Sequence, residues 1–306
     1  MTDTDPDLIA RLYPFQDRAG TAFALIASEA NRSRAYLPLQ LDPRERQYGH
    51  RERESTEPLE GHEDPEDEAC LELRFSHGPR THHGFVFGCG QDSDVVLPSS
   101  VPTISFHHFA LTFDSYYRLI VKDLGSRNGI EVTYGKQGKG RRSNFSWIVG
   151  GDPYLDDNIE IVIHVASHLK FRVVVPQQDM LSHAYINKVE WFLQGTADAE
   201  GLFGQLDLRS RPQTQSASGA HTPGSDPITV SRKVGEGAFG VVFRIWDVGT
   251  GTTYALKQPS QKAIRESRVE VRAWQKEARL LEQLSHVSLP YLIPVMLHNF
   301  SLISLN

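Results

Sequence analysis

Cysteine is scarce in this sequence, which has only Cys70 and Cys89 among 306 residues. A disulfide framework is therefore excluded, and this cysteine usage fits a reducing compartment. The acidic N-terminus also lacks the apolar stretch of about 7 to 15 residues that a signal peptide needs. We expect an intracellular protein, in the nucleus or the cytoplasm.

An excess of positive charge is also missing, since 32 basic and 38 acidic residues leave a net charge of −6. Sequence-independent binding to nucleic acid needs a basic face, and no segment offers one, so we expect no nucleic-acid partner. The negative charge is concentrated in residues 42–69, which hold 11 acidic and 4 basic side chains. This stretch has almost no aliphatic residues and cannot offset its ordering entropy by burial. We predict an acidic, disordered linker.

Helical periodicity is absent between residues 70 and 176, where short β-type runs such as GFVFG, HFALTF and YRLIV alternate with turn residues. Many short strands at regular spacing predict a β-sandwich or barrel. Residues 1–41 contain loosely spaced apolar groups and are predicted to form a helical or mobile segment. Residues 177–210 are predicted to be a helical extension that leaves the β domain, and residues 211–227 a flexible linker rich in Ser, Thr, Pro and Gly.

Three motifs occur in order within residues 70–176: Gly88-Cys89, Ser105-Phe106-His107-His108 and Asn128-Gly129. With these motifs the segment resembles the forkhead-associated (FHA) domain, a β-sandwich that binds phosphothreonine peptides with the loops at one end. The resemblance implies that the Ser105 hydroxyl binds the phosphate and that His108 packs inward and holds the loop. It also implies that Asn128 fixes the peptide backbone and that Gly129 permits the tight turn. Taken alone, Ser105 is also compatible with an ordinary loop serine, and Asn128-Gly129 with an ordinary hairpin turn.

The first motif departs from the family, which has Gly-Arg where this chain has Gly88-Cys89. An arginine would make a charge-assisted contact with a phosphate that carries about −1.5 to −2 charge. Arg127 lies on the neighbouring loop, and we hypothesise that it supplies the missing positive charge.

Four histidines, at positions 82, 83, 107 and 108, suggest a metal site at first sight. Adjacent histidines on a strand face opposite sides, however, and no Cys, Asp or Glu completes a ligand spacing. We therefore expect no metal site here.

A second signal begins at residue 234 with VGEGAFGVVF and continues with YALK at 254–257. The glycines join two strands, whereas a Rossmann motif leads into a helix. Residues 228–286 thus resemble the N-terminal lobe of Ser/Thr protein kinases, with a Gly-rich hairpin over ATP and a following helix C. On a helix, Glu277 shares one face with Leu281 and Leu284.

The kinase resemblance implies a role for each matching residue. Lys257 would hold the α- and β-phosphates of ATP, Glu277 would orient Lys257, and Val242 and Ala255 would sandwich the adenine. The remaining members of the implied nucleotide site are Val234, Gly235, Gly237 and Gly240. The chain contains neither an H-R-D nor a D-F-G sequence, which would supply the base and the Mg²⁺ ligand in a full-length form.

Residues 287–306 are uncharged and mostly apolar. A tail anchor is one interpretation, but Pro290 and Pro294 make a poor membrane span, so we expect no membrane partner. The other interpretation is an aberrant tail from translated intron, in which case the true product continues into a full kinase domain.

The expected fold class is mainly β with an α/β part, an FHA-type sandwich followed by a partial kinase N-lobe. By resemblance, the function is that of an FHA-containing Ser/Thr protein kinase in signalling, with the domain order of DNA-damage checkpoint kinases and only the ATP-binding half present. The expected partners are phosphothreonine-containing proteins and ATP. As written, we expect the chain to be inactive alone. The alternative is a non-catalytic phosphothreonine-binding adaptor or a pseudokinase fragment.

Overall fold

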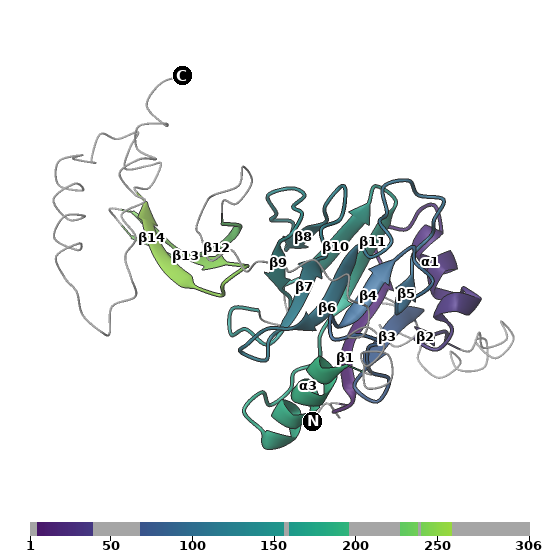
Figure 1. Ribbon diagram of the computed structural model, residues 1–306. Coiled ribbons are helices and arrows are strands. Elements are labelled where there is room, and N and C mark those ends of the chain that lie inside the picture. Colours follow the sequence, from purple (N-terminus) through teal and green to yellow (C-terminus); the bar gives the residue numbers. More distant parts are fainter. Residues whose placement is uncertain (1–4, 39–67, 156–158, 196–226, 238–239, 259–306) are drawn as a thin grey trace, which may run out of the picture. The chain divides into compact units, whose positions relative to one another are not determined.

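The structure is a computed structural model that describes residues 5–38, 68–155, 159–195, 227–237 and 240–258 (Figure 1). The chain divides into two compact units, residues 1–219 and residues 220–306. The described part of unit 1 consists of two β-sheets with short helices, and that of unit 2 is a three-stranded sheet. The predicted mainly-β fold class is confirmed.

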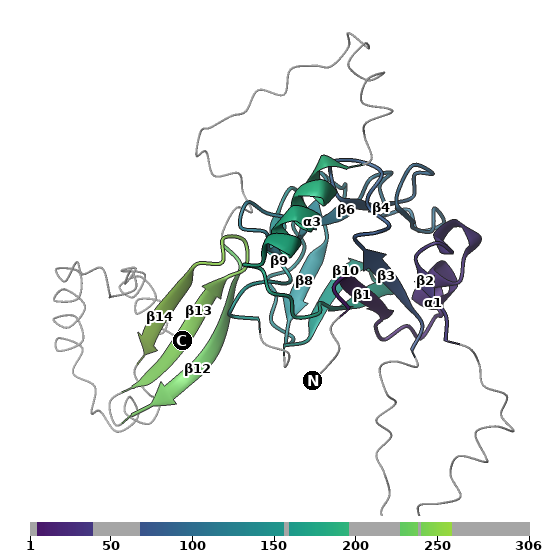
Figure 2. The same ribbon diagram turned by 90° about the horizontal axis from the view of Figure 1, so that it is seen from below.

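Unit 1 is a sandwich of a six-stranded and a five-stranded sheet, seen as two layers in Figure 2. The first sheet has the order β2-β3-β1-β11-β10-β8, and its strands are β1 (Leu8–Pro14), β2 (Ala35–Tyr36), β3 (Cys70–Arg74), β8 (Glu131–Tyr134), β10 (Ile161–Ala166) and β11 (Leu169–Val174). The second has the order β5-β4-β6-β7-β9, and its strands are β4 (Phe85–Gly88), β5 (Val95–Val96), β6 (Phe109–Phe113), β7 (Leu119–Asp123) and β9 (Ser146–Ile148). Only β4 and β5 pair in parallel among these neighbours.

Aromatic side chains fill the space between the two sheets. Phe87 and Phe109 stack with ring centroids 4.5 Å apart, and both are fully buried, as are Phe171 and Trp147. Strands from Cys70 onward follow the runs predicted between residues 70 and 176, because each run places apolar side chains into this core.

The N-terminal segment is part of the sandwich, and the prediction of a helical or mobile segment at residues 8–14 is wrong. Strand β1 lies between β3 and β11 and pairs antiparallel with both, with Leu12 opposite Leu71 and Val173. Leu8, Ile9 and Leu12 on this strand are all buried, although they do not alternate along it. For that reason the segment lacks the alternation of an edge strand and imitates a helical pattern.

The rest of this segment folds against the same unit through α1 (Thr21–Ile26), the 3₁₀ helix η1 (Glu29–Asn31) and β2. The Asn31 side chain donates to the Leu25 and Val96 carbonyls and accepts from the Val96 N–H. A domain boundary at residue 70 is therefore wrong. The sequence between β2 and β3 links two strands that pair with each other, so it is an insertion within one sheet; its residues 39–67 lie outside the described ranges.

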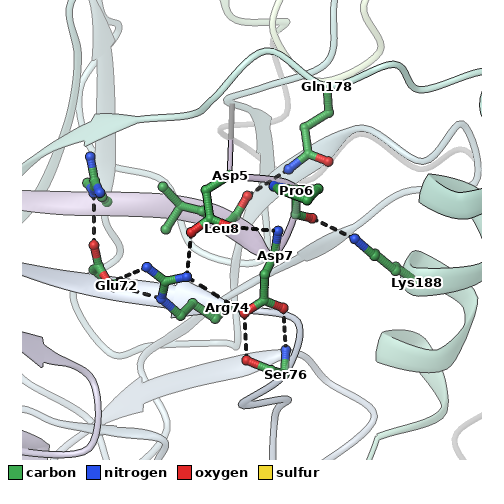
Figure 3. Close-up of polar contacts among 10 residues, drawn as sticks. Asp5, Pro6, Asp7, Leu8, Glu72, Arg74, Ser76, Gln178 and Lys188 are labelled. Atoms are coloured by element: carbon green, nitrogen blue, oxygen red, sulfur yellow. Dashed lines mark hydrogen bonds and ion pairs between the residues drawn. The ribbon is translucent and has the colours of Figure 1, made fainter. Parts of the chain in front are cut away.

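Polar contacts fix the start of β1 (Figure 3). The Arg74 guanidinium donates to Asp5 at 2.6 Å and to Glu72 at 2.8 Å, while Asp7 accepts from the Ser76 N–H at 2.8 Å. The hydrogen bonds that Arg74 donates to Asp5 and Glu72 raise the pKa of Arg74. Because Asp5 and Asp7 are each 69 residues from their partners Arg74 and Ser76, these contacts tie the chain's first described residues to the end of β3.

Helix α3 (His183–Gln194) lies within the helical extension predicted at residues 177–210, but it does not leave the β domain. Its N-cap Ser182 accepts from the Tyr185 N–H at 3.2 Å. Its buried face includes Tyr185 and Phe192, and the Phe192 ring lies 5.1 Å from the rings of Phe85 and Phe113. Residues 196–210 lie outside the described ranges. In the described part of the chain, every helix is too short to cross a bilayer.

Unit 2 contains β12 (Thr229–Glu236), β13 (Val241–Asp247) and β14 (Thr253–Gln258), which form an antiparallel sheet in that order. This matches the predicted sequence of strand, Gly-rich turn, strand and strand. The predicted helix C and the apolar tail lie outside the described residues, as does the predicted linker up to residue 226.

Candidate functional site

The candidate site is formed by loops that meet at one end of the unit 1 sandwich. Strand β4 ends at Gly88 and β6 begins at Phe109, next to each other in the sheet. The Cys89 N–H donates to the Ser105 carbonyl at 3.1 Å, and the Leu124 N–H donates to the His108 carbonyl at 3.1 Å. These bonds join the loops after β4, before β6 and after β7. The three predicted motifs are thus brought together.

His108 holds the loop that carries Ser105. The Ser105 N–H donates to Nδ1 of His108 at 3.1 Å, and the His108 side chain is fully buried. Burial lowers the pKa of His108, so the ring is neutral at pH 7 and its Nδ1 accepts, which leaves the proton on Nε2. Among the described residues, Nε2 has no hydrogen-bond partner. The inward position expected for His108 is what the structure has.

Arg127 and Asn128 lie beside this loop. The Arg127 N–H donates to Oγ of Ser105 at 3.1 Å, and Nδ2 of Asn128 donates to the Thr103 carbonyl at 3.2 Å. Both side chains are exposed, whereas Ser105 is half-buried. Since Oγ accepts from Arg127, the Ser105 hydroxyl can still donate its own hydrogen to a ligand.

Two glycines are required by the close approach of these loops. Gly129 has φ 64°, and a Cβ there would lie 2.7 Å from the Arg142 carbonyl oxygen. At Gly88, a Cβ would overlap the Phe106 carbonyl. The position of Gly129 fits the turn role expected for it.

The Asp123 carboxylate holds the loop after β7 in place. This role was not predicted from the sequence. The buried carboxylate accepts from the N–H groups of Gly125, Ser126 and Asn144 at 2.9, 3.0 and 2.9 Å, and from the Ser126 hydroxyl. The sequence Asp-Leu-Gly-Ser carries the signal of an Asx turn, which would have identified this role.

Cys89 provides no positive charge at the position where the family has arginine. Arg127 is the nearby cation expected to replace it, and the structure places its backbone against Ser105. Of the four histidines, His107 contacts the Asp92 carboxylate, with Nε2 and Oδ2 2.8 Å apart. Within the described ranges, no three His, Cys, Asp or Glu side chains are grouped as metal ligands.

In unit 2, the strand register places four of the predicted nucleotide residues on one face. Val242 lies opposite Gly235 on β12 and opposite Lys257 on β14, so these three residues form a row across the sheet. Ala255 is two residues from Lys257 and shares its face. Glu277 lies outside the described residues, so its pairing with Lys257 stays a prediction.

The Gly-rich turn is closed by hydrogen bonds between its ends. The Gly237 N–H donates to the Gly240 carbonyl at 2.8 Å, and the reverse bond is 3.3 Å long. Val234, also predicted to belong to this site, is 66% exposed. Apart from the adjoining residues of the chain, no described atom lies within 4 Å of a Cβ placed at Gly235 or Gly237.

One family model matches the part of unit 1 that contains these loops. Residues 85–143 match the family model of the FHA domain. The matched FHA region begins with β4 and ends after β8, and it contains Gly88, Ser105, His108, Arg127, Asn128 and Gly129. The predicted FHA domain is thereby confirmed for this region.

The solved structures that match this chain include the crystal structure of Rad53 1-466 in complex with AMP-PNP. The identity is 13% and the TM-score 0.36, and the match covers 94% of this chain and 52% of that chain. This chain therefore spans about half the length of that protein chain. Among curated proteins, the sequence finds no significant match.

Proposed function

We propose that the FHA domain of this chain binds phosphothreonine-containing proteins. The proposal rests on one observation: the loop that carries Ser105 is hydrogen-bonded to the loop that carries Arg127 and Asn128 at one end of the sandwich. The Ser105 hydroxyl has a fixed position, its hydrogen is available, and the Asn128 amide lies exposed beside it. A phosphate on threonine would accept from the hydroxyl, and the exposed amide would bind the peptide backbone.

Titration of the full chain with a degenerate library of phosphothreonine peptides tests this function. We expect binding that disappears when the same peptides lack the phosphate, and that weakens about tenfold or more in Ser105→Ala, because a hydrogen bond to a charged group is lost. Equal binding of phosphorylated and unphosphorylated peptides would refute the function.

Arg127 supplies the positive charge that Cys89 cannot. Replacing Arg127 by Ala is expected to weaken phosphopeptide binding roughly tenfold to hundredfold, since a charge-assisted contact contributes about 1.5 to 3 kcal/mol. Isothermal titration calorimetry at low and high salt measures this, because the lost contact also reduces the salt dependence.

Two matched variants control this prediction. Arg127→Lys keeps the charge and should retain most of the affinity. Arg244→Ala removes one positive charge from unit 2 and should leave the affinity unchanged. Identical titration curves for wild type and Arg127→Ala would show that the charge comes from elsewhere.

We propose as a second function that unit 2 binds ATP as the N-terminal lobe of a protein kinase does. The row of Gly235, Val242 and Lys257 supports it, because it places a glycine, an apolar side chain and an ammonium group side by side on one face. The open space over Gly235 and Gly237 leaves room among the described atoms for phosphates to approach the backbone. When bound, ATP would supply the phosphoryl group of a signalling kinase; Lys257 would hold its phosphates.

Replacing Lys257 by Met in the full chain is expected to weaken ATP binding roughly tenfold to hundredfold, because an ammonium contact with phosphate is lost. Fluorescence titration with a labelled ATP analogue measures the affinity. Lys233→Met is the control, since Lys233 lies on the same hairpin but pairs with Glu236. Equal affinities for all three proteins would reject the ATP site, and an assay with radiolabelled ATP separates a kinase from an adaptor that only binds.

A further inference from the structure

Phe106 is a large aromatic side chain that lies exposed in the candidate phosphate-binding loop. It follows Ser105 directly, and 73% of its surface is exposed. Aromatic side chains are enriched in binding surfaces, since they contribute much contact area for little lost side-chain entropy. A single exposed apolar residue is common on any protein, so the inference depends on how this one is held.

The backbone of Phe106 is fixed by the loop after β4. Its carbonyl accepts from the Gly90 N–H at 3.0 Å and from Oγ of Ser93 at 3.2 Å. The absence of a side chain at Gly88 is what allows this carbonyl to come so close. The backbone that carries the exposed ring is therefore held in one place.

The ring itself lies over Gly90. A Cβ at position 90 would be 3.0 Å from Cδ1 of Phe106, so any larger residue there would push the ring away. The next residue is tied to the same loop, because His107 contacts the Asp92 carboxylate at 2.8 Å. Phe106 and His107 thus both face the loop after β4.

Ser105 contacts the other half of the site, and Phe106 is the next residue in the chain. On one side, Arg127 and Asn128 of the loop after β7 bond to Ser105 and Thr103. On the other side, Phe106 packs on Gly90. A peptide that contacts Asn128 and places its phosphate on Ser105 will meet the Phe106 ring next.

We propose that Phe106 is a specificity-determining residue that selects an apolar side chain in the bound phosphopeptide, on the side of the phosphothreonine away from Asn128. This inference rests on the proposed phosphothreonine-binding function. The ring offers an apolar surface on a backbone that is already held in place, and an aliphatic or aromatic peptide side chain would cover it. A charged side chain at the same peptide position would lose hydration without gaining a partner.

An oriented phosphothreonine peptide library, in which one flanking position at a time is varied, tests this selection on the full chain. In the wild type we expect one flanking position at which Leu, Ile or Phe binds about tenfold more tightly than Gly or Asp. Phe106→Ala should abolish this preference while peptides with Gly at that position bind as before. Phe106→Leu, which keeps an apolar surface, should restore most of it.

Phe23→Ala is the matched control, because Phe23 is also an exposed phenylalanine, 51% exposed on α1. It should leave the preference unchanged. If phosphorylated peptides bind in both wild type and Phe106→Ala with the same residue preferences, the inference is overturned and the proposed function stands. If no peptide binds in a phosphate-dependent manner, the proposed function fails, and the inference fails with it.

Discussion

Replacing Leu12 by Asp will unfold unit 1. Leu12 is fully buried on the central strand β1, where it lies opposite Leu71 and Val173. Removing a buried leucine costs about 2 to 5 kcal/mol, and burying a carboxylate without a partner costs several kcal/mol more. Since a domain has roughly 5 to 15 kcal/mol of stability in total, the sheet should not survive. Circular dichroism of the full chain should show that the β signal of unit 1 is lost at 25 °C.

Arg18→Asp is the control for this prediction, because Arg18 belongs to the same N-terminal segment but is exposed. It changes the charge in the same direction and should leave the melting curve nearly unchanged. Leu12→Asp must also abolish phosphopeptide binding, since the loops of the FHA domain extend from the same sandwich. A Leu12→Asp chain that melts like the wild type would mean that β1 contributes nothing to the sheet.

The sequence predicts the strands from residue 70 onward but not β1, and the reason is physical. Half-buried strands show alternating polarity, whereas five of the seven residues of β1 are buried, including Leu8, Ile9 and Ala10 in a row, so its apolar residues follow no period of two. Its pairing with β11 joins Pro14 to Phe171, more than 150 residues away, and no local pattern encodes such a contact. The acidic stretch between β2 and β3 further separates β1 from the strands that it joins.

The candidate site was more accessible to prediction than the fold around it. Ser105, His108 and Gly129 stand in motifs whose spacing reflects a local turn, and the structure gives each a position that suits its expected role. The sequence did not predict the side chains that hold the fold together through contacts between distant parts of the chain. Asn31 bonds to Val96, and Arg34 bonds to Asp94, across about 60 residues of sequence.

Replacing Arg34 by Met will destabilise unit 1 by about 3 to 5 kcal/mol, because it leaves the Asp94 carboxylate buried without its cation. The two side chains are only 8% and 0% exposed, and Nη2 of Arg34 lies 3.1 Å from Oδ1 of Asp94. Burial lowers the pKa of Arg34 and raises that of Asp94, so each charge is costly without the other. Arg34 also donates to the His77 carbonyl at 2.8 Å. For a domain of this size, the melting temperature should fall by roughly 6 to 20 °C.

Arg32→Met is the matched control, since Arg32 pairs with Glu29 on the surface, where both side chains are about 80% exposed. Such a pair contributes little, so the melting temperature should hardly change. Adding Asp94→Asn to Arg34→Met should recover part of the loss, because the buried charge is removed while the amide oxygen still accepts from the Val86 N–H. Equal melting of Arg34→Met and Arg32→Met would mean that the buried pair does not hold the N-terminal segment.

The buried pair of Arg34 and Asp94 is also expected to affect phosphopeptide binding. Asp94 ends the loop that carries Gly90 and Asp92, and this loop holds Phe106 and His107 beside the phosphate-binding serine. Measured at a temperature where Arg34→Met is still folded, phosphopeptide affinity should therefore fall in Arg34→Met and not in Arg32→Met. An unchanged affinity would restrict the role of Arg34 to stability. A reduced affinity would show that a residue outside the matched FHA region positions the loops that read the peptide, because Arg34 lies before residue 85.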